Sequence, residues 1–209
     1  MRFLNFDNVL CLSPHPDDVE YSMLGSVLIH KDTHFDVFCL SAGGDFDKTT
    51  SSQRWLENGK IWSQIKNGDI TFSDVRFLKE KGQDGWINYI EANFINKNNY
   101  DCIFIPTKDD SHFEHQIVNN LGAPLTRNKK ISIVEYRTPS TLDSWSPNMF
   151  VEIDENSYDR KIKLLEYFET QRDRWYFKNE VLSSFHANYP SHKRGMQKVE
   201  CYRILQLCK

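Results

Sequence analysis

The chain has 209 residues and a net charge of −3 at pH 7. A chain of this length can bury one sizeable core, so we expect residues 1–209 to form a single domain. The small negative charge and the lack of a long basic segment argue against nucleic acid as a partner. No apolar run approaches the roughly 20 residues that span a bilayer, and the N-terminus lacks the apolar centre of a signal peptide. We therefore expect a soluble, cytoplasmic protein without an integral membrane segment.

Short apolar segments recur along the chain, and the stretches between them are long enough for helices. The strand candidates are Val9–Leu12, Phe35–Leu40, Val75–Leu78, Cys102–Ile105, Ile131–Glu135 and a closing strand at Cys201–Leu207. The helix candidates are Val19–His30, Gln53–Asn67, Trp86–Asn98, His115–Leu121 and Asn156–Phe177. Alternation of strands and helices indicates βαβ units. The sequence thus predicts an α/β fold, a Rossmann-like three-layer sandwich with a mainly parallel sheet of five or more strands.

The first strand candidate runs into a dense group of polar residues. Pro14 and Pro16 end the strand, and Asp17 or Asp18 can cap the helix that follows. His15 and the two aspartates therefore lie at the carboxyl end of a strand, where open α/β sheets hold their ligands. One imidazole and two carboxylates at this edge predict a metal site.

A second polar group follows the strand at Cys102–Ile105 in the same way, after a proline at position 106. Its members are Asp109, Asp110, His112, Glu114 and His115. The two histidines are three residues apart, so on a helix or tight turn they can approach a common point. Hydrolytic zinc sites use three protein ligands and keep one position open, and a His/Asp/His set suits them.

The two groups together resemble the motifs of the PIG-L (LmbE-like) N-deacetylases, metal-dependent hydrolases that remove an acyl group, usually acetyl, from an N-acylated amino sugar. The family pattern Pro-His-Pro-Asp-Asp-x-Glu matches residues 14–20. The pattern Asp-x-His-x-Asp-His matches residues 110–115, with Glu114 in place of the usual Asp. Weaker similarities follow in the family's order at 41–45, 54–57, 149–153 and 163–171. The resemblance implies a zinc-dependent N-deacetylase, with Fe²⁺ or another divalent ion as an alternative to Zn²⁺.

The resemblance also implies which residues hold the ion. His15, Asp18 and His115 align with the family's metal ligands. Asp17 aligns with its general base, which takes a proton from the attacking water and can later deliver one to the leaving amine. Adjacent side chains leave the backbone in different directions, which agrees with separate duties for Asp17 and Asp18.

The remaining site residues are assigned by the same alignment. His112 is the candidate that stabilises the oxyanion as an imidazolium, or that protonates the leaving nitrogen. Either Glu114 or Asp110 is expected to orient it. Arg54 is expected to contact substrate hydroxyls or phosphate, and Asp45 to meet a sugar hydroxyl or brace its loop.

Two features outside the motifs lead to further expectations. The segment 138–148 is the best candidate for a long loop, and its Trp145 either walls the rim of the site or merely covers the core. The histidines without partner spacing are expected at the surface: His30, His34, His186 and His192.

The favoured function is hydrolysis of the acyl amide of an amino sugar, free or linked to a nucleotide or carrier. One alternative is a nucleotide-binding Rossmann module, although the first strand ends in Pro-His-Pro-Asp-Asp and not in a glycine-rich turn. The other is a catalytically retired relative that serves as a binding or assembly subunit. The sequence leaves the oligomeric state open.

Overall fold

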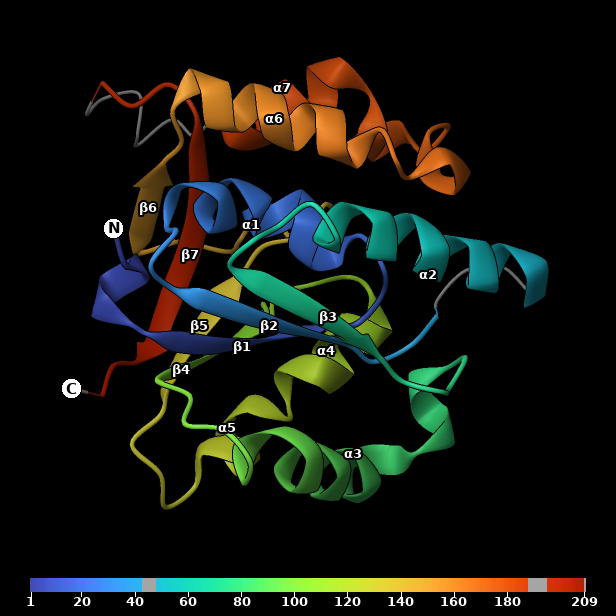
Figure 1. The fold of residues 1–209 in the computed structure, drawn as a ribbon, viewed down its shortest axis with the longest axis vertical. Coiled ribbons are helices and arrows are strands. Elements are labelled where there is room, and N and C mark those ends of the chain that lie inside the picture. The colour runs from blue at the N-terminus through green and yellow to red at the C-terminus, as the bar shows by residue number, and fades with distance from the viewer. Residues whose placement is uncertain (43–47, 188–194, 209) are drawn as a thin grey trace.

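The structure, a computed structural model, describes residues 1–42, 48–187 and 195–208, and for residues 48–51 it describes the backbone alone. Seven strands within these ranges form one sheet. They are β1 Asn8–Ser13, β2 His34–Cys39, β3 Gly68–Phe72, β4 Cys102–Pro106, β5 Ser132–Tyr136, β6 Met149–Glu152 and β7 Val199–Gln206. The order is β3-β2-β1-β4-β5-β7-β6, with β1 to β5 parallel and β7 antiparallel to both of its neighbours (Figure 1). The predicted α/β fold with a mainly parallel sheet is confirmed.

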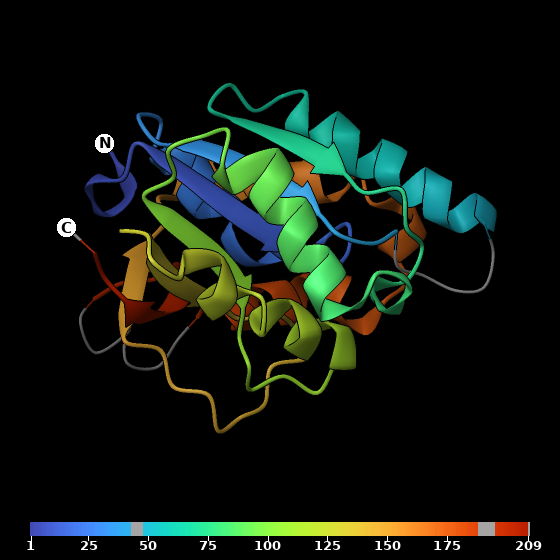
Figure 2. The same cartoon turned by 90° about the horizontal axis from the view of Figure 1, so that it is seen from below.

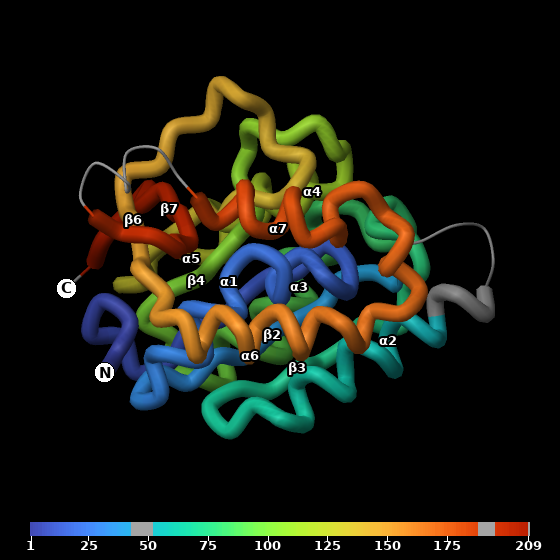
Figure 3. The backbone as a smooth tube through the Cα atoms, turned by 90° about the horizontal axis from the view of Figure 1, so that it is seen from above, coloured from blue at the N-terminus to red at the C-terminus, as the bar shows by residue number. Residues whose placement is uncertain are grey.

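Helices cover both faces of the sheet. One face carries α1 Asp18–Ile29, α2 Lys48–Trp62, α6 Glu155–Leu165 and α7 Asn179–His186. The other carries α3 Gly82–Ile90, α4 Phe113–Asn119 and α5 Gly122–Thr126 (Figure 2). Single turns lie at Phe3–Asn5, Leu78–Glu80, Glu169–Gln171 and Trp175–Phe177, and a π-helical turn at Glu91–Ile95 continues α3. Helices α6 and α7 pack on the outer side of α1 (Figure 3). No helix in the described ranges is long and apolar enough to cross a bilayer.

Successive residues of the central strands enter two different cores. In β1, Val9 and Cys11 join the core under α1, whereas Leu10 and Leu12 join the core over α3. A parallel strand covered on both faces is apolar at every position, because side chains alternate between the faces. This continuous apolar run explains why the sequence reveals β1 so clearly.

The third predicted strand, Val75–Leu78, is wrong. The third strand is β3, Gly68–Phe72, which lies at the edge of the sheet and exposes Asp69 and Thr71. An edge strand needs few apolar residues, so its sequence signal is weak. The apolar run at 75–78 instead packs as a bend and the start of a single helical turn.

The predicted helix Asn156–Phe177 is too long. Helix α6 ends at Leu165, and the chain turns at Phe168, whose backbone angles are φ −78° and ψ 66°. Phe168 is buried, so the apolar spacing continues across the break and imitates a helix. Thr170 holds the turn in place by donating from its backbone N (3.1 Å) and its hydroxyl to Glu57 (2.6 Å).

The expectation that His30 and His186 lie at the surface is wrong, since both are buried. Nε2 of His186 accepts a hydrogen bond from Lys161 Nζ at 2.9 Å, and Lys161 also pairs with Glu200 Oε1 at 2.6 Å. Burying a charge without a partner is costly, and this pair satisfies both charges where α6, α7 and β7 meet.

One part of the loop after β5 covers the core, and another part lines the site. Trp145 packs against Val199 and Cys201, so it covers the core and does not wall the site. Pro139 and Ser140, at the start of the same loop, do line the cavity described below.

Candidate active site

The two polar groups meet at the carboxyl ends of β1 and β4, which are neighbours in the sheet. The chain leaves β1 toward α1 on one face and leaves β4 toward α4 on the other, so this is the point where the strand order reverses. A cavity of about 360 Å³ opens here. The sequence-predicted residues that line it are His15, Asp17, Asp18, Arg54, His112 and His115.

The backbone of Asp17 is held in an unusual conformation. Its φ is 126° and its ψ is −28°, a region that L-residues with a side chain rarely adopt. Its N–H donates to Glu20 Oε2 at 3.1 Å, and its carbonyl accepts from Tyr21 N at 2.7 Å in the first turn of α1. Such strain costs about 1–3 kcal/mol and clusters at functional sites.

This strain leads to a test of stability. Asp17→Gly should be more stable than Asp17→Ala by up to about 2 kcal/mol, because both variants lose the carboxylate and only glycine relieves the backbone. The relief of about 1–3 kcal/mol exceeds the roughly 1 kcal/mol that glycine's freedom in the unfolded chain costs. Denaturant unfolding of the two metal-free variants measures the difference. An Asp17→Gly variant that is less stable than Asp17→Ala by about 1 kcal/mol, the cost of glycine alone, would show that the backbone at position 17 stores no strain.

The carboxylate of Asp17 is buried and held at both oxygens. Oδ1 accepts from Arg54 Nη2 at 3.2 Å, and Oδ2 accepts from the Tyr176 hydroxyl at 3.3 Å. Burial raises the pKa of Asp17 to about 6, against the opposing charge of Arg54. A carboxyl group with a pKa near neutrality is suited to take up and release a proton.

Asp18 lies between two histidines. Its Oδ2 is 3.2 Å from His15 Nδ1 and 3.3 Å from His115 Nε2. Two donors bound tetrahedrally at about 2.0–2.1 Å from one ion lie about 3.3 Å apart, so both distances match a shared ion. Although burial opposes it, the charges and hydrogen bonds of the two histidines hold the pKa of Asp18 well below its usual range.

The far nitrogens of the same two histidines each meet a carboxylate. His15 Nε2 lies 2.5 Å from Glu114 Oε2, and His115 Nδ1 lies 3.0 Å from Asp110 Oδ2. Carboxylates in this position fix the tautomer of metal-binding histidines and leave the opposite nitrogen free for the ion. His15 Nδ1 and His115 Nε2 therefore face Asp18 Oδ2, and each is spaced from it as two ligands of one divalent ion would be.

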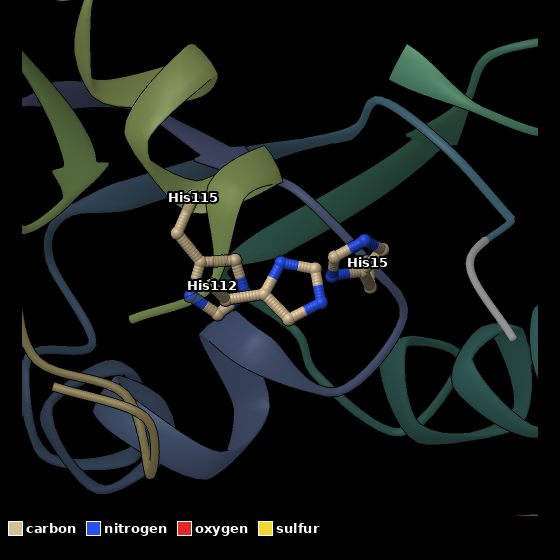
Figure 4. A group of neighbouring side chains, drawn as sticks. All are labelled: His15, His112 and His115. Carbon is tan, nitrogen blue, oxygen red and sulfur yellow. The ribbon is translucent and has the colours of Figure 1, made fainter. Parts of the chain in front are cut away.

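His112 shares this site, as Figure 4 shows, with its ring beside those of His15 and His115. The ligand atoms of the three rings lie within 4.8 Å of one another, and the rings of His112 and His115 stack at 4.5 Å. His112 caps α4, and its Nδ1 accepts from the backbone N–H of Glu114 at 3.3 Å. Partial burial and the charges of the other two rings lower the pKa of His112.

The lowered pKa and the accepting Nδ1 favour a neutral His112 over the imidazolium considered from the sequence. With Nδ1 accepting a hydrogen bond, the ring hydrogen of the neutral form is on Nε2. The ring can then donate a hydrogen bond without carrying a charge.

Of the two carboxylates expected to orient His112, Asp110 accepts a hydrogen bond from the backbone N of His112 at 2.8 Å. The imidazole contacts of these carboxylates lie elsewhere, because Glu114 bonds to His15 and Asp110 bonds to His115. His112 precedes α4 whereas Glu114 lies in its first turn, so the two side chains diverge. Glu114 Oε1 accepts from Leu78 N at 3.1 Å, which directs its other oxygen toward His15.

Several site residues have no counterpart among the sequence predictions. Thr138 and Ser140 brace Asp110 with hydroxyl hydrogen bonds of 2.6 Å and 2.7 Å. Their position directly after a strand candidate was the available signal. Four further cavity residues come from the segment mistaken for a helix: Gln171, Arg174, Trp175 and Tyr176.

Arg54 and Asp45 are the remaining predicted site residues, and the structure describes only Arg54. Arg54 is buried in the site, and its Nη2 donates to Pro16 O at 2.9 Å as well as to Asp17. Its Nε has no hydrogen-bond partner among the described residues. Asp45 lies outside the described residues.

Comparisons with known proteins give the fold. No protein-family model matches the chain, and no curated protein matches it significantly. Among solved structures, N,N'-diacetylchitobiose deacetylase from Pyrococcus horikoshii is 19% identical, with a TM-score of 0.76 over 98% of this chain and 85% of that one. The A40926 pseudoaglycone deacetylase Dbv21 is 13% identical, with a TM-score of 0.74 over 97% and 99%.

A third solved structure carries a different activity. The 4-carboxy-2-hydroxymuconate hydratase GalB from Pseudomonas putida is 14% identical, with a TM-score of 0.70 over 95% of this chain and 96% of that one. One fold thus hosts deacetylases and a hydratase, so the function has to be argued from the site. The chain shares this fold.

Proposed function

We propose that this single-domain protein is a metal-dependent N-deacetylase, which hydrolyses the acyl amide of an N-acylated amino sugar, free or linked to a nucleotide or carrier. The observation that carries the proposal is the convergence of His15, Asp18 and His115 beside a buried carboxylate, Asp17, in one cavity. Two similar solved structures are named as deacetylases, one of them of diacetylchitobiose, which supports the same reaction class.

The ion would be held by His15 Nδ1, Asp18 Oδ2 and His115 Nε2. Nitrogen and carboxylate donors in this number suit Zn²⁺, and Fe²⁺ accepts the same set. Bound there, the ion would lower the pKa of water and polarise the acyl carbonyl.

Asp17 moves the proton. Its carboxylate takes a proton as water attacks the acyl carbon, and it returns that proton to the nitrogen as the C–N bond breaks. The products are the carboxylic acid and the free amine. Arg54 and Tyr176 each hold one carboxylate oxygen, so the group is oriented before the substrate arrives.

His112 stabilises the negative charge that develops on the carbonyl oxygen. Its Nε2–H donates a hydrogen bond to that oxygen, while its Nδ1 stays fixed by the first turn of α4. A neutral donor in this role keeps its proton, so Asp17 alone serves the leaving nitrogen.

The position of Glu114 leads to a test by metal affinity. Glu114→Gln should weaken metal binding about 10- to 100-fold, because the carboxylate that orients His15 is lost. Competition with a chelator measures the affinity, and Glu80→Gln on an exposed turn serves as the control. An unchanged affinity, with a shifted alkaline limb of the pH–rate profile, would instead assign Glu114 to His112.

The function is tested with the metal-loaded protein and a panel of N-acetylated amino sugars and their nucleotide conjugates. Release of acetate from at least one member, absent in Asp17→Asn, is the expected result. Stoichiometric metal with no acetate release across the panel would favour a retired binding subunit over an enzyme.

A further inference from the structure

The segment between α6 and α7 forms one wall of the cavity. Tyr21 of α1 anchors it twice: its hydroxyl donates to Tyr176 O at 2.9 Å, and its ring packs against that of Phe177 at 5.8 Å. Helix α2 adds the hydrogen bonds of Glu57 to the same segment. Contacts with α1 and α2 therefore hold this wall of the cavity in position.

Trp175, in this wall, is unusually exposed for a tryptophan. Tryptophan is normally largely buried, yet the side chain of Trp175 is 58% exposed and lines the cavity. Its ring stands edge to face with that of Tyr176, at 5.7 Å and 88°. Most of the other lining groups are polar or charged, so the indole contributes a large apolar surface to an otherwise polar site.

The position of Trp175 relates it to the reacting groups. Tyr176 bonds to Asp17 through its hydroxyl and contacts Trp175 through its ring. Trp175 is thus linked to the general base through one residue, Tyr176. Asp17 and Trp175 line the same cavity, so a substrate whose acyl group lies near Asp17 has this wall within the same space.

We propose that Trp175 is a specificity-determining residue, whose indole face stacks on a pyranose ring of the substrate. This inference rests on the proposed deacetylase function. A pyranose presents C–H groups on its face and hydroxyls around its edge. Its face can cover the indole, while its hydroxyls meet polar groups such as Arg54, Ser140 and Gln171. An open-chain amide has the same polar groups but no ring face.

The test compares a ring substrate with its open-chain counterpart. The substrates are the methyl glycoside of N-acetylglucosamine and N-acetylglucosaminitol, assayed with the metal-loaded protein. Trp175→Ala should lower kcat/KM for the glycoside about tenfold, mainly through KM, since roughly 50 Å² of apolar contact at about 25 cal/mol per Å² is lost. The alditol should be unaffected, and Trp175→Phe should restore most of the loss.

The matched control is Tyr167→Ala, an exposed aromatic of the same segment that does not line the cavity. Equal losses for both substrates, or no loss for the glycoside, would overturn the role of Trp175.

Calorimetric binding to metal-loaded Asp17→Asn separates this inference from the proposed function. If the unmodified protein releases no acetate, the deacetylase proposal fails. The stacking role is then decided by whether adding Trp175→Ala weakens binding of the glycoside but not of the alditol.

Discussion

Asp17→Asn should lower turnover by about 10²- to 10⁴-fold while leaving the ion bound. The amide keeps the size of the carboxylate and can still bond to Tyr176, but it cannot take a proton. Burial raises the pKa of Asp17 to about 6 in the metal-free protein. The charge of a bound divalent ion lowers the pKa of a neighbouring carboxyl group, so the metal-loaded protein should lose activity below about pH 6, as Asp17 becomes protonated. In the variant, this acid limb should disappear from the residual activity.

Steady-state rates and elemental analysis of the same preparation measure both effects. Asp143→Asn, an exposed carboxylate outside the cavity, is the control and should behave as the unmodified protein. Near-normal turnover in Asp17→Asn would remove it as the base. Loss of the ion would mean that Asp17 and Asp18 have exchanged duties.

His115→Ala should lose most of the ion together with essentially all activity. The residue offers Nε2 beside Asp18, and its other nitrogen is held by Asp110, so the substitution removes a proposed ligand together with the contact that orients it. The control is His34→Ala, because His34 also lies near two carboxylates, Asp36 and Asp69, but far from the cavity residues in the fold. Retention of a stoichiometric ion in His115→Ala would contradict the assignment.

The same residue predicts the pH dependence of metal binding. Although burial opposes it, Asp18 and Asp110 raise the pKa of His115 to about 10 in the metal-free protein. The ion must displace this proton, so affinity should rise with pH, about tenfold per unit for each proton released. Chelator competition at several pH values measures the slope. A slope of zero between pH 6 and 9 would show that no histidine proton is displaced.

The stability of the metal-free fold depends on pH in the opposite direction to metal affinity. The folded pKa of His115 lies above its ordinary value of 6.5, so its charge stabilises the metal-free fold fully below about pH 6.5. That contribution is lost as the pH rises through about 10.

The local sequence determined the strand–loop–helix unit at residues 8–29 and the groups that it carries. A strand buried on both faces is apolar throughout, Pro14 and Pro16 end it, and Asp17 begins the next helix. Because these signals act over a few residues, His15 and both aspartates could be placed at the sheet edge without knowledge of the rest of the chain.

The tertiary structure alone decided which carboxylate serves which histidine. Glu114 and His15 are 99 residues apart, and their contact depends on the direction in which α4 begins and on Leu78 from a third segment. Contacts between distant segments also determine the position of the cavity wall that carries Trp175 and Tyr176. Its apolar spacing resembles a helix, and only packing against Tyr21 and Glu57 turns the chain at Phe168. Such long-range contacts leave no periodic signal, because each depends on where distant elements lie in the fold.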